Sequence, residues 1–331
     1  MLKSPLPEKS IVMRDKENSR SRKWKEMAIR GKQRGGANSG PGTGMEWSFV
    51  TTDSKLISRA WKGIPDCWRG AAWHAFLSSS AASRQIGKPD AELVSIYNEL
   101  IERPSSDDVQ IDLDVPRTIS SHIMFRRRYR GGQRLLFRVL HSLALYFPEV
   151  GYVQGMASIA ATLLCYYDEE TAFVMMVRLW ELRGLAQLYT AGFGGLMEAL
   201  DEFETGWMKG NTISKKLNNL NIGPTAWGTR WYLTLFNYSI PFAAQLRIWD
   251  VFMLLGDPEP GSKTHFGGTL DVLHATSAAI LDGLRTIILK SDFEEAMKNL
   301  TSFIPVKDED LLMKVVKGEW KAKRRKFVGH F

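Results

Sequence analysis

Apolar residues recur at helical spacing along most of the chain, and no segment sustains the apolar–polar alternation of a half-buried strand. The clearest case is the segment 133–147, which stops at Pro148. One face of the helix predicted there carries Leu135, Leu136, Val139, Leu140, Leu143 and Phe147. The chain is therefore predicted to be all-α, built from helices that pack their apolar faces together.

Two further apolar runs bear on this prediction. The run MASIAATLLCYY, residues 156–167, is almost wholly apolar, and we expect it to form a helix at the centre of the core. The run WYLTLFNY, residues 231–238, is rich in the aromatic residues and threonine that strands favour. We interpret it as a helix because its neighbours in the sequence show helical spacing.

Length and composition suggest two packed subdomains with terminal tails, because 331 residues are many for one compact domain and 44% of them are apolar. Cys67 and Cys165 have neither metal-ligand nor redox spacing, which favours a reducing compartment. The N-terminus lacks the apolar region of a secretory signal. The longest nearly uncharged run, residues 151–167, is too short and too polar to cross a bilayer. The expected location is cytoplasmic.

The net charge of +8 is concentrated at the two ends of the chain. Residues 1–45 hold 11 Lys or Arg against 4 Asp or Glu, and residues 314–331 hold 7 against 1. The body between them is acidic, which argues against a nucleic-acid partner. Residues 1–45 have too little apolar area to offset their ordering entropy, so we predict a disordered basic tail. This tail could contact an anionic membrane, remain solvated or, as a weaker alternative, bind RNA.

Familiar catalytic motifs are missing from the sequence. The segment GDPEPGSKT resembles a phosphate-binding loop, but Ser262 separates Gly261 from the lysine that should follow it. The six histidines show no zinc-binding spacing, and no nucleophile signature is present. We therefore expect neither a nucleotide nor a metal cofactor bound by this chain itself.

Arg117 and Gln154 are the strongest candidates for catalysis. They lie at the two ends of the segment 111–155, each beside a break in regular structure. Taken singly, Arg117 could form an ion pair with Asp114, and Gln154 could cap the helix that follows it. Taken together, they match what GTP hydrolysis by a slow GTPase requires: a cation for the transferring phosphoryl oxygens and an amide that orients water.

Four sequence blocks, in order, resemble the TBC-domain family of Rab GTPase-activating proteins. They are KGIPDCWRGAAW, IDLDVPRT, YFPEVGYVQGM and WYLTLFNYSIPFAAQLRIWDVF, and the resemblance covers roughly residues 47–300. It implies an all-helical, V-shaped pair of subdomains over residues 46–305, the first extending to about residue 190. Residues 306–331 would form a basic C-terminal helix and tail.

The resemblance also implies a mechanism with two inserted side chains. Arg117 would be an arginine finger and Gln154 a glutamine finger, acting on a Rab-family GTPase that supplies the GTP and Mg²⁺. Such a protein regulates vesicle trafficking, and it could be peripheral on endomembranes. The alternative is a non-catalytic Rab-binding or membrane-tethering scaffold on the same fold.

Several further residues match the family motifs. Supporting roles at the two fingers would fall to Asp114, Thr118, Tyr152 and Gly155. Structural roles would fall to Gly63, Pro65, Arg69, Trp73, Arg247 and Asp250. The sequence departs from the family pattern at Ser120, where proline is usual, and at Val153 and Ala157. The loss of proline is expected to loosen the loop that carries Arg117.

Overall fold

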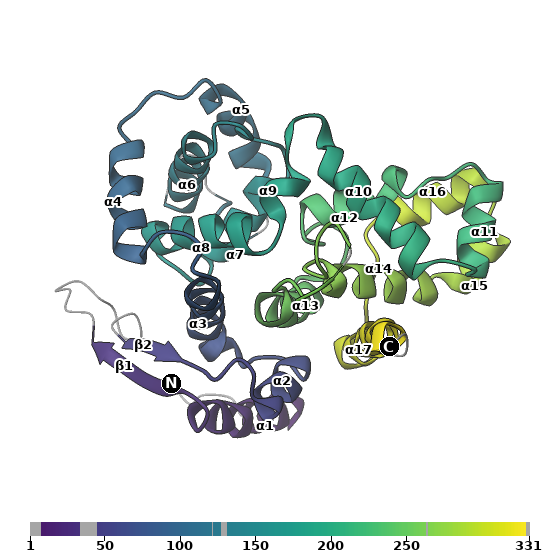
Figure 1. Ribbon diagram of the computed structural model, residues 1–331, viewed down its shortest axis with the longest axis horizontal. Coiled ribbons are helices and arrows are strands. Elements are labelled where there is room, and N and C mark those ends of the chain that lie inside the picture. Colours follow the sequence, from purple (N-terminus) through teal and green to yellow (C-terminus); the bar gives the residue numbers. More distant parts are fainter. Residues whose placement is uncertain (1–7, 34–44, 121, 127–130, 263, 329–331) are drawn as a thin grey trace.

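The computed structural model describes residues 8–33, 45–120, 122–126, 131–262 and 264–328 (Figure 1). Most of the described chain is helical, and its only strands are two short ones, which confirms the all-α prediction. Its α-helices are α1 (Glu8–Lys25), α2 (Ser54–Trp61), α3 (Asp66–Arg84), α4 (Asp90–Leu100), α5 (Asp108–Asp114), α6 (Gly132–Tyr146), α7 (Met156–Leu164), α8 (Glu169–Leu182), α9 (Leu185–Leu188), α10 (Gly194–Glu202), α11 (Thr212–Asn219), α12 (Thr225–Leu233), α13 (Phe242–Leu255), α14 (Asp271–Gly283), α15 (Arg285–Lys290), α16 (Phe293–Thr301) and α17 (Glu309–Val328).

Short elements complete the chain. A 3₁₀ turn, η1 (Val115–Arg117), follows α5, another, η2 (Ala191–Phe193), precedes α10, and a π-helical turn, η3 (Phe203–Trp207), follows α10. Strands β1 (Ile29–Gln33) and β2 (Met45–Ser48) pair antiparallel, with Ile29 opposite Ser48.

The helices form two groups in a V-shaped arrangement, as predicted (Figure 1). In the first group, α6 packs against α4, α7 and α8. In the second, α10 packs against α12, α11 against α15, and α14 against α13 and α17. Helices α3 and α13 contact each other and join the two groups. The chain passes from the first group to the second between α9 and α10.

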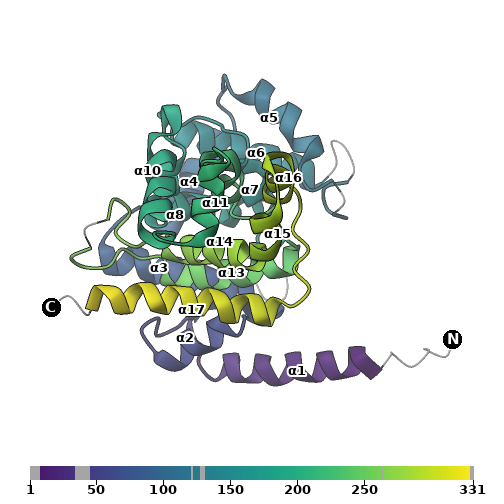
Figure 2. The same cartoon turned by 90° about the vertical axis from the view of Figure 1, so that its right-hand side faces the viewer.

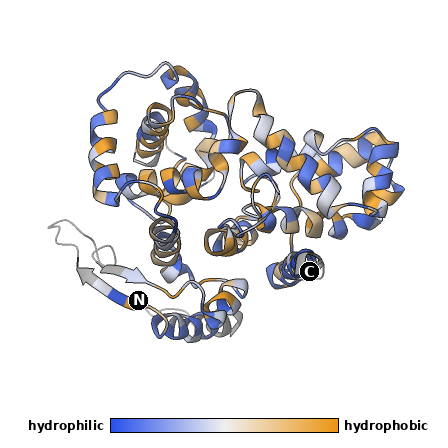
Figure 3. Cartoon of the chain, viewed as in Figure 1, coloured by the Kyte–Doolittle hydropathy of each residue, from blue (hydrophilic) through white to orange (hydrophobic). Residues whose placement is uncertain are grey.

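Apolar burial explains the central helices. All nine residues of α7 are buried, as the sequence predicts, although the helix ends at Leu164 and the apolar run continues to Tyr167. Ten of the fourteen residues of α13 are buried. Figure 3 shows α13 mostly in the hydrophobic colour, whereas the coloured part of α1 is largely hydrophilic. The core therefore follows the apolar runs of the sequence.

The helix predicted over residues 231–238 is only partly correct. Helix α12 ends at Leu233, and the chain then turns through two buried residues with positive φ, Leu235 (+46°) and Phe236 (+67°). The side chain of Trp249 donates a hydrogen bond to the Leu235 carbonyl at 3.0 Å. Tertiary packing and this hydrogen bond favour the turn over continuation of the helix.

The prediction of a disordered tail over residues 1–45 is wrong between Glu8 and Gln33, where the structure has α1 and β1. Trp24, in the last turn of α1, is 2% exposed and meets Phe49 edge to face, with ring centroids 5.7 Å apart. Polar contacts add to this, because Glu17 accepts a hydrogen bond from the Asp66 backbone at 2.9 Å. One large buried aromatic residue can anchor a polar helix, and the average composition of the segment does not reveal it.

Candidate functional site

Arg117 lies at the end of η1, immediately after α5. Pro116 occupies the middle of that turn, where its fixed φ suits a tight helical turn and its missing N–H costs nothing. The side chain of Arg117 is 59% exposed, whereas that of Asp114, three residues earlier, is only 3% exposed. The guanidinium group of Arg117 therefore extends into solvent, while the carboxylate that it pairs with is buried.

Asp114 is the residue that joins the two loops of the site. One of its carboxylate oxygens forms an ion pair with Arg117 and accepts a hydrogen bond from Gln110 at 3.3 Å. The other accepts one from the Tyr152 hydroxyl at 2.7 Å. The Thr118 hydroxyl donates to the Asp114 backbone carbonyl at 2.8 Å. Burial, followed by the hydrogen bond to Asp114, raises the pKa of Tyr152, so this phenol stays protonated and donates.

Gln154 lies in the turn between α6 and α7, two residues after Tyr152. The turn is fixed at Tyr152, whose backbone N–H donates to the Asp107 carboxylate at 2.9 Å. Within the described residues the exposed side chain of Gln154 makes no hydrogen bond, and no side chain caps α7. Gln154 therefore does not cap α7, contrary to the alternative considered from the sequence.

Gly155 allows the glutamine turn to approach α12. Its φ is +115°, and a Cβ atom there would lie 3.1 Å from the Leu233 backbone carbonyl. The same carbonyl accepts a hydrogen bond from the Tyr189 hydroxyl, so it cannot move away freely. A side chain at position 155 would be strained in both dihedral angle and packing.

Arg117 and Gln154 line one groove of about 750 Å³, together with Asp114, Thr118 and Gly155. The other lining residues come from α7, α12, Thr234, Tyr238 and the end of α16. The structure thus brings the two candidate fingers and three of their supporting residues to one concave surface. Tyr152 is not a lining residue, but its hydroxyl donates a hydrogen bond to Asp114 and so helps to fix the loop of Arg117.

Several groove residues were not predicted from the sequence, among them Arg230 and Tyr238. Arg230 donates to the Thr301 carbonyl at 2.9 Å, and its guanidinium carbon lies 5.8 Å from the Tyr238 ring centroid. Burial raises the pKa of Tyr238. In the sequence, Arg230 follows the small polar residues Thr225 and Thr229 of α12, which is a weak indication of a polar surface. Its position is far in the sequence from the motifs of Arg117 and Gln154.

The loop after Arg117 contains the departure at Ser120. Ile119, just before it, has φ of +43°, a conformation that β-branched residues rarely adopt. Ser120 itself is exposed. The backbone is therefore strained next to the candidate arginine finger.

The residues with predicted structural roles gather away from the groove, where α3 meets α13. The Asp250 carboxylate, fully buried, accepts hydrogen bonds from Arg69 at 2.9 Å, from Trp73 at 3.0 Å and from the Ile64 backbone at 2.8 Å. Pro65 directly precedes α3.

Gly63 and Arg247 meet beside this cluster. A Cβ atom at Gly63, whose φ is +90°, would lie 2.3 Å from Nε of Arg247. Close packing of the arginine therefore requires glycine.

Other kinds of site find no support in the part of the chain described. No group of three or more His, Cys, Asp or Glu side chains is arranged there to hold a metal ion. None of the described helices is long and apolar enough to cross a membrane. Lys263, the lysine of the GDPEPGSKT segment, lies outside the described residues.

Comparisons with known proteins point to one family. The sequence model of the Rab-GTPase-TBC domain matches residues 66–281. The TBC domain-containing protein C1778.09 of Schizosaccharomyces pombe is 46% identical over 309 residues, which cover 92% of this chain and 68% of that protein. The Rab GTPase-activating protein tbc-11 of Caenorhabditis elegans is 30% identical, over 76% of this chain but only 25% of its own length.

A solved structure shares the fold. The Ypt/Rab-GAP domain of Gyp1p superimposes with a TM-score of 0.69 at 15% identity, covering 94% of this chain and 99% of that domain.

Proposed function

Because the chain belongs to the Rab-GTPase-TBC domain family, we propose that it is a GTPase-activating protein for a Rab-type small GTPase. The observation that carries the proposal is the single groove to which Arg117 and Gln154 both contribute, with Asp114 joining their loops. The names of relatives such as tbc-11, a Rab GTPase-activating protein, support the same activity.

In the proposed mechanism, Arg117 enters the nucleotide site of the GTPase and neutralises charge that develops on the transferring phosphoryl group. Gln154 positions the attacking water, since its amide can accept from water and donate to a phosphoryl oxygen. The GTP and Mg²⁺ belong to the GTPase. This chain supplies two polar side chains that are already held near each other, which reduces the entropy lost on reaching the transition state.

The ion pair between Arg117 and Asp114 is compatible with this role. The guanidinium group has five N–H donors, and the pair with Asp114 leaves others unused. The buried carboxylate limits the rotamers of an otherwise mobile, exposed side chain. A structural arginine would instead be expected to bury its charged end.

A single-turnover GTP hydrolysis assay with a panel of Rab proteins tests the proposal. Arg117→Ala is expected to reduce the stimulated rate by ~10³–10⁵-fold, the usual contribution of an arginine finger. Gln154→Ala is expected to abolish most of the stimulation as well. Matched controls are Arg285→Ala and Gln187→Ala, which remove the same side-chain types outside the groove. Full stimulation by both groove variants would sink the two-finger mechanism.

The competing proposal is a non-catalytic scaffold that binds a Rab protein or tethers a membrane. It predicts that the wild-type chain binds GTP-loaded Rab without accelerating hydrolysis by any member of the panel. The two exposed finger residues favour catalysis, because a scaffold does not require them. The same panel identifies the partner.

We also propose a cytoplasmic protein that acts in vesicle trafficking and contacts anionic endomembranes peripherally through its basic N-terminal segment. We expect sedimentation with anionic liposomes to be weaker for the combined variant Arg22→Gln, Lys25→Gln and Arg30→Gln, which removes charge from exposed residues and keeps the buried Trp24 in place. Equal sedimentation of this variant and the wild type would count against the contact.

A further inference from the structure

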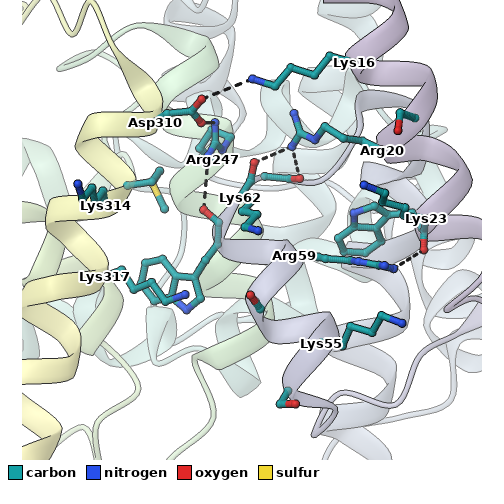
Figure 4. Close-up of a pocket in the computed structure, with 17 residues that line it drawn as sticks. Lys16, Arg20, Lys23, Lys55, Arg59, Lys62, Arg247, Asp310, Lys314 and Lys317 are labelled. Atoms are coloured by element: carbon teal, nitrogen blue, oxygen red, sulfur yellow. Dashed lines mark hydrogen bonds and ion pairs between the residues drawn. The ribbon is translucent and has the colours of Figure 1, made fainter.

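A second cavity, of about 940 Å³, lies between α1, α2 and α17, and is lined by nine basic side chains and one carboxylate, Asp310 (Figure 4). The basic residues come from all three helices and from Arg247 on α13. They therefore surround a single space instead of forming a stripe along one face.

The arginines of this cavity are positioned mainly by backbone carbonyl groups. Arg20 donates to the Lys62 carbonyl at 2.6 Å, and Arg59 donates to the Lys23 carbonyl at 2.6 Å (Figure 4). Neutral carbonyl groups fix the direction of a guanidinium group without cancelling its charge. Positive charge is thus held in place around the cavity.

Asp310 is shared between two cations. It accepts a hydrogen bond from Arg247 at 2.9 Å and lies 3.7 Å from the ammonium group of Lys16. Arg247 is largely buried, and its Nε atom has no hydrogen-bond partner among the described residues. A second carboxylate, Glu17, lies 3.6 Å from the guanidinium group of Arg20. Two carboxylates cannot balance the nine cations, and the Nε–H of Arg247 remains unsatisfied.

Three lysines of the cavity, Lys55, Lys62 and Lys314, are exposed and form no ion pair within the described chain. Lys317 lies over the Trp61 ring, 5.7 Å from its centroid. Burial, and then the nearby charges of Lys321 and Lys62, lower the pKa of Lys317. Neighbouring positive charge therefore adds to the effect of burial on Lys317.

We propose that this cavity binds a compact anion that carries several phosphate groups, such as an inositol polyphosphate or the headgroup of a phosphoinositide. Its volume falls in the range of small-molecule sites, which is about 300–1,000 Å³. Fixed guanidinium groups suit phosphate oxygens, and flexible lysines add charge without strict geometry. An extended nucleic acid would require a longer basic track than three converging helices provide.

The cavity and the finger groove lie on different sides of the molecule. Figures 1 and 2 share a vertical axis. In both, α1, α2 and α17 lie below helices α13 and α14, whereas α5 and α16 lie above them. Occupation of the cavity therefore leaves the groove open. The inference stands independently of the catalytic proposal, because its test measures binding alone.

The first experiment uses the full chain and inositol hexakisphosphate as a soluble probe, with affinity measured by isothermal titration calorimetry and stability by thermal melting. The cavity variant is Lys55→Gln, Lys62→Gln and Lys314→Gln combined. The control variant, Lys209→Gln, Lys215→Gln and Lys290→Gln, removes the same charge from exposed lysines outside the cavity. Unliganded melting curves establish that both variants fold.

We expect the probe to raise the Tm of the wild type and of the control, and the cavity variant to bind it about tenfold more weakly or worse. Equal affinities for the two variants, or no binding by the wild type, would overturn the proposal. Tighter binding to a single-stranded RNA than to inositol hexakisphosphate would also contradict it, in favour of an extended polyanion.

A second experiment distinguishes the lipid from the soluble source. Phosphatidylcholine vesicles that contain a phosphatidylinositol bisphosphate are compared with vesicles brought to the same surface charge by phosphatidylserine. Preferential binding to the former, lost in the cavity variant, supports a lipid headgroup. Binding of the soluble probe without vesicle binding supports a free polyphosphate. Equal binding to both kinds of vesicle by all variants refutes the lipid headgroup as the ligand, because general surface charge then explains the membrane binding.

Discussion

At the scale of single residues, the groove depends on groups that do not reach the proposed partner. Asp114 is buried, yet it contacts Arg117 directly and reaches the loop of Gln154 through Tyr152. Two loops that are separate in sequence thereby share one carboxylate. The relative position of the two fingers is set by hydrogen bonds behind the groove, whereas the finger side chains themselves stay exposed.

Tyr152→Phe tests this connection. The change removes the hydroxyl that donates to Asp114 and leaves one buried carboxylate oxygen without that donor, so the free energy of unfolding should fall by about 1–2 kcal/mol. Stimulated GTP hydrolysis should also fall, because the loop of Gln154 is no longer hydrogen-bonded to the loop of Arg117 through Tyr152 and Asp114. Urea unfolding and single-turnover assays measure the two effects. Tyr146→Phe, whose hydroxyl has no hydrogen-bond partner in the described chain, is the control and should alter neither.

Gly155→Ala tests the close approach of the glutamine turn to α12. The new methyl group meets the Leu233 carbonyl at 3.1 Å at a φ of +115°, so we expect a loss of about 2 kcal/mol or more and impaired stimulation. Gly192→Ala introduces a methyl group at a φ of +76° with nothing within 4 Å, and should cost only about 1 kcal/mol. Equal losses for both variants would show that the contact with Leu233 is unimportant.

At the scale of elements, helix α14 carries two buried titratable groups with opposite effects on stability. His274 accepts or donates a 2.6 Å hydrogen bond with the Tyr232 hydroxyl, and burial followed by the charge of Lys323 lowers its pKa to about 3. Burial and the nearby charge of Glu202 raise the pKa of Asp271 to about 7. One helix thus favours a neutral imidazole and a neutral carboxyl group.

The pH dependence of unfolding should separate the two groups. Below pH 6.5 the unfolded chain protonates His274 and the folded chain does not, so stability falls by up to about 2 kcal/mol towards pH 5. From about pH 4 to 7, folded Asp271 retains a proton that the unfolded chain releases, so stability falls as pH rises. His274→Gln should remove the first slope and Asp271→Asn the second, in urea unfolding followed from pH 5 to pH 7.5. Slopes unchanged in both variants would contradict these assignments.

Local burial decides which elements could be predicted from sequence. Helices α6 and α7 follow from apolar residues whose spacing alone specifies a buried face. The end of α12 could not be predicted, because Leu235 and Phe236 turn in response to neighbours distant in sequence. The same holds for the site. The motifs pointed to Arg117 and Gln154, whereas Arg230 enters the groove only because the fold places α12 opposite them.

At the scale of the whole molecule, one buried ion pair joins the two helical groups. Arg69 on α3 and Asp250 on α13 are 181 positions apart in sequence and meet at 2.9 Å, both largely buried. The apolar core around them forms one cluster that extends through both groups. Unfolding of the two groups should therefore be coupled.

Asp250→Ala should be among the most destabilising single changes. It leaves the Arg69 guanidinium and the Trp73 N–H buried without their acceptor, for an expected loss of about 3–5 kcal/mol in urea unfolding. Asp282→Ala breaks the exposed pair with Arg285 and should cost roughly 0–1 kcal/mol. Similar losses for the two variants would show that the buried pair contributes little to holding the halves together.

The neighbouring positions Gln154 and Gly155 are subject to different kinds of selection. Gln154 is exposed, and its side chain makes no hydrogen bond within the described residues, so the fold itself would tolerate many residues there. Gly155 faces a fixed backbone carbonyl, so the fold tolerates almost nothing else. Loss of the activity during evolution would release the first position and leave the second unchanged. Variation at residue 154 among descendants of this chain would therefore record whether the activity has been kept, while residue 155 would record only that the protein still folds.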